Sequence, residues 1–246
     1  MRKLIQGIVD FRENIRPTYR ETFAKLALGQ SPDALFLACS DSRVVPNLFA
    51  STDPGDLFVL RNVGNLVPPC SSSQGGVDEL SEGAALEFSI EILKVSDIIV
   101  CGHSHCGAAR AILEGATQEG SYLNRWLQHG APSLMRLRSG ETLDRNLDLV
   151  DQLSQINVLQ QIEHLKTYPQ VRRALQEGRI RLHAWWFEIS RAEVMAFCSE
   201  HNQFLPIDRQ QADRLLSELS AGKTSIDQIQ HKLEESPCHS KSCDKK

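Results

Sequence analysis

The sequence predicts an α/β protein with a central, mostly parallel sheet of four strands and one edge strand, flanked by helices and preceded by an N-terminal helical arm. Two observations support this prediction. Short apolar runs bounded by turn residues, at 34–38, 57–60 and 97–101, alternate with segments of helical periodicity. Strands that alternate with helices in this way form parallel sheets covered on both faces.

The composition is that of an ordinary globular protein. Of the 246 residues, 41% are hydrophobic and 24% are charged, which excludes an intrinsically disordered chain. No apolar run reaches the roughly 18 residues of a membrane span, and the net charge of −4 argues against nucleic acid, so we expect neither a membrane nor a nucleic-acid partner. Polar residues interrupt the apolar start of the chain and leave no export signal. The seven cysteines are then expected to be reduced thiols in a cytoplasmic protein.

The first 29 residues are expected to form the helical arm. Its apolar residues fall at helical spacing, and Pro17 marks either a break or the first turn of a second helix. The run 34–38 is a candidate buried strand, Pro46 opens a short helix, and 57–60 is the second strand. Residues 62–82 are rich in Gly, Pro and Ser and form a long loop, which in compact domains is typical of functional or mobile segments.

The second half of the chain continues the alternation. A helix is expected over 83–94, a third strand over 97–101 and a helix from Gly107. Residues 121–178 are mostly helical, followed by a fourth parallel strand over 179–187 and an edge strand over 193–197. We expect one domain over 1–208, a C-terminal extension of two short helices over 209–235, and a disordered tail over 236–246.

Three potential metal ligands follow two of the predicted strands. Cys39 comes just after the first strand, and His103 and Cys106 come just after the third. In open α/β sheets, ligands bind beyond the carboxyl ends of the strands, so these side chains are expected to converge. Two thiolates and one imidazole suit zinc, and three protein ligands leave a fourth position open, as in catalytic sites. A single buried cysteine is more often a small hydrophobe, and Cys101 is interpreted in that way.

Asp41 and Arg43 lie beside the first ligand. The carboxylate of Asp41 could bind the metal or accept a hydrogen bond there, and Arg43 would keep it ionised and draw it away from the metal. The simpler interpretation is a loop salt bridge. His105 has poor spacing for a ligand and is interpreted as a surface or supporting residue, with a weaker hypothesis that it helps proton transfer.

The segment Cys39-Ser40-Asp41-Ser42-Arg43, followed by His103-x-x-Cys106, resembles the β-class carbonic anhydrases. Further segments match that family in order over roughly residues 1–200: 55–59, 61–65, 82–87 and 182–185. The resemblance implies reversible hydration of carbon dioxide to bicarbonate by hydroxide on zinc. It implies one Zn²⁺ per subunit, held by Cys39, His103 and Cys106, with Asp41 and Arg43 as the catalytic pair.

The plant-like branch of this family offers the best match to the substrate pocket. There a glutamine and a phenylalanine line the pocket, and Gln30 and Phe58 occupy those positions here. The third pocket residue is a tyrosine in those members and is Phe88 in this chain, so one hydroxyl is lost. The family also implies a homodimer or a larger assembly of dimers, with the helical arms crossing onto the partner.

Another branch of the family closes its site at lower pH and binds bicarbonate in a regulatory pocket. That pocket is formed by a tryptophan, an arginine and a tyrosine. This chain keeps Arg61 but has Phe36 and Phe187 at the other two positions, so two hydrogen-bond donors are missing. We therefore expect an open site with no bicarbonate switch.

Two other functions are compatible with the same residues. Relatives that hydrolyse carbon disulfide or carbonyl sulfide share this zinc site. A non-catalytic zinc or redox-sensing protein is the third hypothesis, although a structural zinc site would not need Asp41, Arg43 or Gln30. The tail carries Cys238, His239 and Cys243, for which metal binding is the weaker hypothesis and a solvated tail the stronger.

Overall fold

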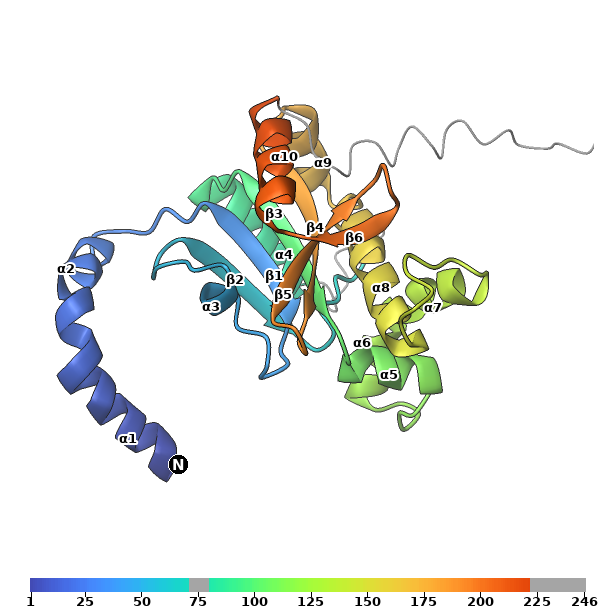
Figure 1. Cartoon of the computed structure of the whole chain (residues 1–246), viewed down its shortest axis with the longest axis horizontal. Helices are drawn as coiled ribbons and strands as arrows, with labels where there is room; N and C mark the ends of the chain where they lie inside the picture. Colours follow the sequence, from blue (N-terminus) through green and yellow to red (C-terminus); the bar gives the residue numbers. More distant parts are fainter. Residues whose placement is uncertain (71–79, 222–246) are drawn as a thin grey trace, which may run out of the picture.

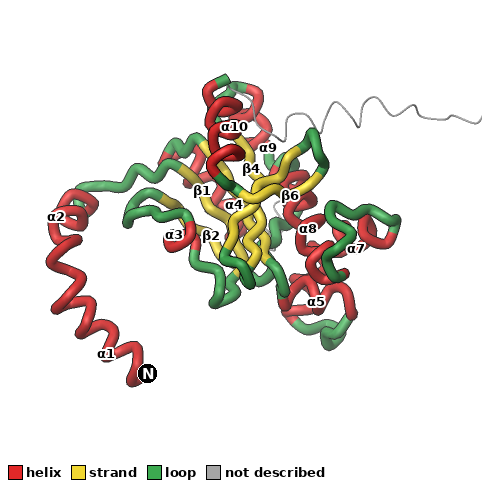
Figure 2. The backbone as a smooth tube through the Cα atoms, in the orientation of Figure 1, coloured by secondary structure: helices red, strands yellow, loops and turns green. Residues whose placement is uncertain are grey.

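The computed structural model describes residues 1–70 and 80–221. Within these ranges a six-stranded sheet, in the order β2-β1-β3-β4-β5-β6, forms the centre of the molecule (Figures 1 and 2). Strands β1 to β4 are parallel, whereas β5 is antiparallel to β4 and β6 is antiparallel to β5. The strands are β1 (Ala34–Cys39), β2 (Leu57–Asn62), β3 (Asp97–His103), β4 (Arg181–Glu188), β5 (Glu193–Cys198) and β6 (Gln203–Pro206).

The predicted α/β class and the four parallel strands are confirmed, but the number of strands is not. The segment predicted as the edge strand is β5, and it lies inside the sheet because β6 pairs with its other side. β6 has only four residues and ends at Pro206, so it carries almost no alternating pattern. A strand this short is recognisable only from the neighbour with which it pairs.

The helices follow the predicted segments, with several subdivisions. The predicted helix over 83–94 begins earlier and changes to π-helical geometry after Glu87, and the region 121–178 divides into four helices and a 3-10 turn. They are α1 (Arg2–Asp10), η1 (Phe11–Ile15), α2 (Arg16–Leu26), α3 (Pro46–Phe49), α4 (Leu80–Glu87), η3 (Phe88–Leu93), α5 (Gly107–Glu114), α6 (Tyr122–Leu127), η4 (Gln128–Gly130), α7 (Ala131–Arg138), α8 (Leu149–Leu165), α9 (Pro169–Gln176) and α10 (Arg209–Ser220).

Of the expected C-terminal extension, α10 is one helix. The predicted second helix, the tail over 236–246 and the side chains of Cys238, His239 and Cys243 lie outside the described residues.

The two faces of the sheet pack against different layers. In β1, Leu35 and Leu37 point to the main core, where α4, α8 and α9 supply residues such as Val158. The alternate residues Phe36 and Ala38 point to the opposite face and belong to a smaller cluster that includes aromatic rings of α3 and β4. β1 is buried along its whole length because both of its faces are covered.

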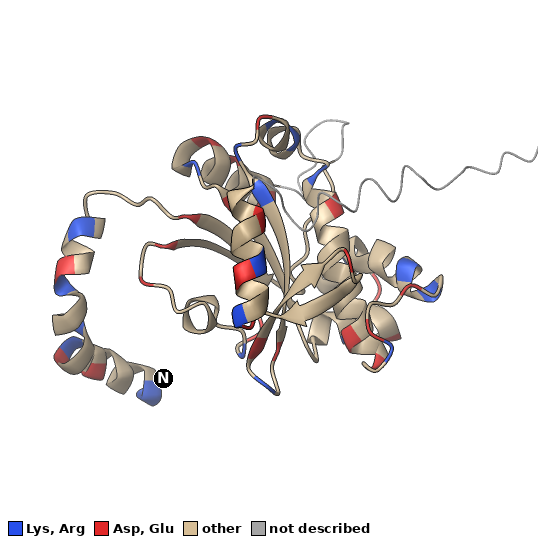
Figure 3. Cartoon of the chain, turned by 45° about the horizontal axis from the view of Figure 1, so that its top comes forward, with Lys and Arg blue, Asp and Glu red and all other residues tan. Residues whose placement is uncertain are grey.

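The N-terminal arm stands away from this body. No residue of α1, η1 or α2 is buried, and Figure 1 shows the arm in blue as a curved helical segment that lies apart from the sheet. Along it, Figure 3 shows basic and acidic segments interspersed. The arm also leaves large apolar side chains exposed: Leu4, Ile5, Ile8, Val9, Phe11, Ile15 and Phe23. Such an apolar surface is typical of a segment that is covered by another chain.

Candidate metal centre

The three predicted metal ligands come together at the carboxyl ends of two neighbouring strands. β1 and β3 pair in parallel, so Cys39 at the end of β1 lies beside the end of β3, where His103 is the last residue. Cys106 follows in the turn that begins α5. The two sulfur atoms and an imidazole nitrogen lie within 4.8 Å of one another, and all three residues are buried.

The orientation of His103 leaves one ring nitrogen free for a metal. Its Nδ1 lies 2.9 Å from the carbonyl oxygen of Ser104, which assigns the proton to Nδ1 because a carbonyl only accepts. Nε2 is buried and has no hydrogen-bond partner. A buried, unpaired nitrogen is costly unless something binds it. Because a nitrogen of this ring lies within 4.8 Å of both sulfur atoms, the donor set fits a tetrahedral cation such as zinc.

The electrostatics of the two cysteines favour negative charge at this point. A hydrogen bond from Cys106 lowers the pKa of Cys39, and the same contact together with burial raises the pKa of Cys106. The contact between the two sulfur atoms therefore favours the thiolate form of Cys39, and a bound cation would favour the thiolate form of both cysteines. The backbone N–H of Gly64 adds to this by donating to the Cys39 sulfur at 3.4 Å.

Asp41 and Arg43 form a two-pronged ion pair at the mouth of the site. The Arg43 guanidinium donates to both carboxylate oxygens, from Nε at 2.9 Å and from Nη2 at 2.7 Å. These bonds hold the pKa of Asp41 well below its usual range, so the carboxylate is ionised at neutral pH. Asp41 Oδ2 lies 4.0 Å from His103 Nε2, and Arg43 also donates to the backbone of His105.

Arg61 holds the segment that carries the first ligand and the carboxylate. Its Nε and Nη2 donate to the carbonyl oxygen of Cys39 at 3.0 and 2.9 Å, and Nη2 donates to the carbonyl oxygen of Asp41 at 2.7 Å. No sequence motif predicts this role of Arg61. The signal was its place near the end of β2, whose last residue pairs with Cys39. Arg61 thereby fixes the backbone of both residues.

The three predicted pocket residues do not reach this site within one chain. Phe58 lies four positions before Asn62, the residue of β2 that pairs with Cys39, and four strand residues span about 13 Å. Phe88 packs against Phe58, with ring centroids 5.7 Å apart. Gln30 precedes β1 and therefore also lies toward the amino end of the sheet. Within one chain these side chains therefore lie away from the metal ligands, and their assignment to the substrate pocket stays a prediction.

His105 lies outside the ligand set. It is half exposed with a positive φ of 53°, and its Nδ1 lies 3.8 Å from Asp151. Its backbone N–H donates to the same carboxylate at 2.5 Å. This agrees with the interpretation of His105 as a surface or supporting residue.

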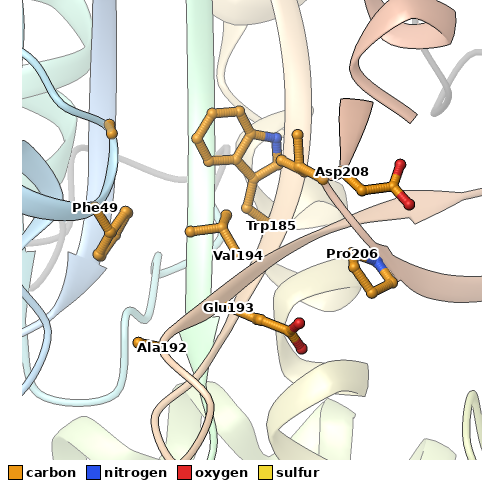
Figure 4. A pocket seen from close by; sticks show the side chains of 9 residues that line it. Phe49, Trp185, Ala192, Glu193, Val194, Pro206 and Asp208 are labelled. Atoms are coloured by element: carbon orange, nitrogen blue, oxygen red, sulfur yellow. The ribbon is translucent and has the colours of Figure 1, made fainter. Parts of the chain in front are cut away.

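A separate pocket lies on the face of the sheet to which Phe36 and Ala38 point. It has a volume of about 450 Å³, with the Trp185 indole as one wall and the carboxylates of Glu193 and Asp208 among the lining groups (Figure 4). The full lining is Phe49, Ala50, Trp185, Ala192, Glu193, Val194, Pro206, Ile207 and Asp208. It contains none of the candidate site residues, so it is distinct from the metal centre.

Two cysteines and a histidine beside a salt-bridged aspartate, at the end of an α/β sheet, form a candidate metal site with three protein ligands, the number typical of enzymes, whereas closed structural sites have four. A family model described as carbonic anhydrase matches residues 34–194, which include Cys39, Asp41, Arg43, His103 and Cys106. The chain is 43% identical over 197 residues to a carbonic anhydrase of Synechococcus elongatus, which covers 79% of this chain and 71% of that protein. It is 38% identical to carbonic anhydrase 1 of Escherichia coli, with 84% and 92% covered.

Solved structures agree with the sequence matches. The β-carbonic anhydrase CcaA superposes with a TM-score of 0.75 at 37% identity, covering 85% of this chain and 92% of that one. A tetrameric β-carbonic anhydrase of Sordaria macrospora has a TM-score of 0.68 at 30% identity, with 79% and 95% covered. The chain belongs to the β-class carbonic anhydrases. It is therefore an enzyme, and the general reaction of its family is the hydration of carbon dioxide. No helix in the described ranges is long and apolar enough to span a bilayer.

Proposed function

We propose that this chain catalyses the reversible hydration of carbon dioxide with one Zn²⁺ per subunit, held by Cys39, His103 and Cys106. The observation that carries the proposal is the buried, unpartnered Nε2 of His103, whose ring has a nitrogen within 4.8 Å of the sulfur atoms of Cys39 and Cys106. Zinc, when bound, supplies a Lewis acid that makes water acidic enough to provide hydroxide near neutral pH. Two thiolate ligands donate more charge than imidazoles do, so we expect activity to rise into mildly alkaline pH.

Asp41 has the properties of the hydrogen-bond acceptor that orients the nucleophile. It is ionised, and its Oδ2 lies 4.0 Å from Nε2 of His103. Both of its oxygens accept hydrogen bonds from Arg43, which fixes the orientation of the carboxylate. A carboxylate held in this way can accept a hydrogen from the attacking oxygen and so direct an oxygen lone pair toward the carbon. The bond to Arg43 also keeps Asp41 from becoming a fourth metal ligand.

We propose that a second copy of the chain completes the substrate pocket. Gln30, Phe58 and Phe88 lie at the far end of their own sheet, while Phe88 is 41% exposed and the arm leaves its apolar face uncovered. In a twofold dimer each copy can offer these side chains to the metal centre of the other. The arms then provide the apolar contact that holds the pair together. Larger assemblies of such dimers are compatible with this arrangement.

We also propose that the site stays open and has no bicarbonate switch. Phe36 is fully buried and contacts the rings of Phe49 and Trp185, and Phe187 stacks on Phe49 at 4.8 Å. These positions therefore hold packed hydrocarbon instead of donors for an anion. Arg61, the remaining charged group, donates to backbone carbonyl oxygens.

The cytoplasmic location stays a prediction.

Two substitutions test the assignment of roles. Cys39→Ser is expected to lose zinc, measured as metal per subunit after dialysis, while Cys101→Ser, which changes a buried cysteine outside the ligand set, retains it. Asp41→Asn is expected to keep zinc and lose most carbon dioxide hydration, while Asp144→Asn in a remote turn keeps both. Full activity of Asp41→Asn would refute its role. A zinc-loaded wild type active only on carbon disulfide or carbonyl sulfide would refute the substrate.

A further inference from the structure

Helix α8 carries a row of buried polar side chains that the proposed mechanism does not use. Its members recur every three or four positions and so share one face of the helix. Each is at most 6% exposed, although polar groups are costly to bury without partners. We call this row the polar stripe of α8: Asp151, Ser154, Asn157, Gln161 and His164.

The first part of the stripe binds the turn that contains two of the metal ligands. Ser154 Oγ donates to the carbonyl oxygen of His103 at 2.7 Å, and Asp151 accepts from the backbone N–H of His105 at 2.5 Å. The indole N–H of Trp186 donates to Ser154 Oγ at 3.1 Å. Because that donor occupies one lone pair of the hydroxyl, the Ser154 hydrogen is directed toward His103.

The second part of the stripe binds the loop that contacts the third ligand. Asn157 Nδ2 donates to the carbonyl oxygen of Gly64 at 3.2 Å, and Gln161 Oε1 accepts from the N–H of Val67 at 2.8 Å. His164 Nδ1 lies 2.7 Å from the carbonyl oxygen of Val67. This is the loop whose Gly64 N–H donates to the Cys39 sulfur. One rigid helix therefore holds segments that are far apart in the sequence.

Close packing supports the same conclusion. A Cβ added at Gly102, directly before His103, would lie 2.6 Å from Val158 of α8 and 3.4 Å from the carbonyl oxygen of Ser154. β3 and α8 thus meet with no room for a side chain between them. The hydrogen bonds of the stripe act across this contact and fix the register of the helix against the strand end.

We propose that the polar stripe of α8 is the positioning element of the metal centre, with Ser154 as the positioning residue for His103. This inference rests on the proposed metal site at Cys39, His103 and Cys106. The stripe holds the ligand-bearing turn and the loop that contacts Cys39 in the geometry that the metal requires, so that these segments need no ordering when the metal binds. Outer hydrogen bonds of this kind typically change metal affinity by about 10- to 100-fold.

A matched pair of substitutions separates positioning from general stability. Ser154→Ala removes the hydroxyl that bonds His103, whereas Ser89→Ala removes an equally buried hydroxyl that bonds Leu86 at 3.0 Å, in the helix formed by α4 and η3. Both variants are expected to lower the unfolding temperature of the metal-free protein. Only Ser154→Ala is expected to change the thiolate-to-metal absorption of the Co²⁺-loaded enzyme and to raise the rate of Zn²⁺ release to a chelator by about tenfold or more.

The outcomes distinguish the inference from the proposed function. If Ser154→Ala releases zinc no faster than Ser89→Ala and leaves the cobalt spectrum unchanged, the positioning role is overturned while the metal site stands. If the wild-type enzyme shows no thiolate-to-cobalt absorption, the metal site itself is wrong and the inference fails with it. A selective change in Ser154→Ala supports both.

Discussion

Replacing Gly102 by alanine should destabilise the protein, because α8 and β3 touch at this residue. The new methyl group would lie 2.6 Å from Val158 Cγ2 and 3.1 Å from Trp186 Cδ1. Carbon atoms pack at about 3.5–4.0 Å, so the helix or the strand must shift. Overpacking of this kind costs about 1–3 kcal/mol, and we expect Gly102→Ala to lower the free energy of unfolding by about 2 kcal/mol.

Urea unfolding of the metal-free proteins at one fixed concentration measures this cost. Gly83→Ala is the control: its methyl group would lie 3.6 Å from Tyr168, an ordinary contact, and alanine in α4 should stabilise by up to about 1 kcal/mol. Val158→Ala removes the obstructing methyl group, so the double variant Gly102→Ala/Val158→Ala should lose less than the sum of the two single losses. Additive losses, or a Gly102→Ala protein as stable as the wild type, would refute the reasoning.

The remaining predictions concern charge and assembly. Burial alone would raise the pKa of Asp97, but hydrogen bonds from His183 and Arg181 lower it well below its usual value. A carboxyl group whose pKa is lower in the folded than in the unfolded protein stabilises the fold at pH values above its unfolded pKa. This stabilisation is lost as the pH falls through the pKa of the folded state. Asp97→Asn should therefore lower the free energy of unfolding in urea by about 1–2 kcal/mol at neutral pH. The difference in this free energy between wild type and variant should shrink below about pH 4, and a difference that stays constant with pH would contradict the prediction. Ile8→Asp in the arm, where Ile8 is 67% exposed, should weaken self-association in sedimentation by about tenfold or more, whereas Leu216→Asp, 61% exposed on α10, should not. Arg61→Lys should weaken zinc binding by about tenfold in a competition with a chelator, because lysine lacks the planar guanidinium that donates to both carbonyl oxygens. Unchanged zinc affinity would show that Arg61 does not support the metal site.

The convergence of the metal ligands could be predicted because it depends on local rules. Cys39 and His103 each follow a short apolar strand, and parallel strands end at the same edge of a sheet. The ion pair of Asp41 and Arg43 is equally local, since only Ser42 lies between the partners. Neither feature needs the rest of the fold to be known.

Other features depend on contacts that a sequence pattern does not contain. The positions of Phe58 and Phe88 relative to the metal ligands follow from the register of β2 against β1, which periodicity does not give. The polar stripe was hidden because α8 is buried on several sides, so its apolar spacing marks Leu153 and Ile156 but not the polar residues among them. Those polar residues become interpretable only when the 63–67 loop and the 103–106 turn are seen against the helix.

Carbon dioxide hydration at the buried Cys39, His103 and Cys106 site, and a site that remains open, are the two parts of the proposed function. Stopped-flow hydration by the zinc-loaded protein, from about pH 6.5 to about pH 9, tests it most directly. We expect activity that rises smoothly to a plateau at alkaline pH and is lost in Asp41→Asn. A steep collapse below about pH 8 would mean that Asp41 captures the metal, against the proposed open site. No activity at any pH with zinc bound would contradict the proposed reaction.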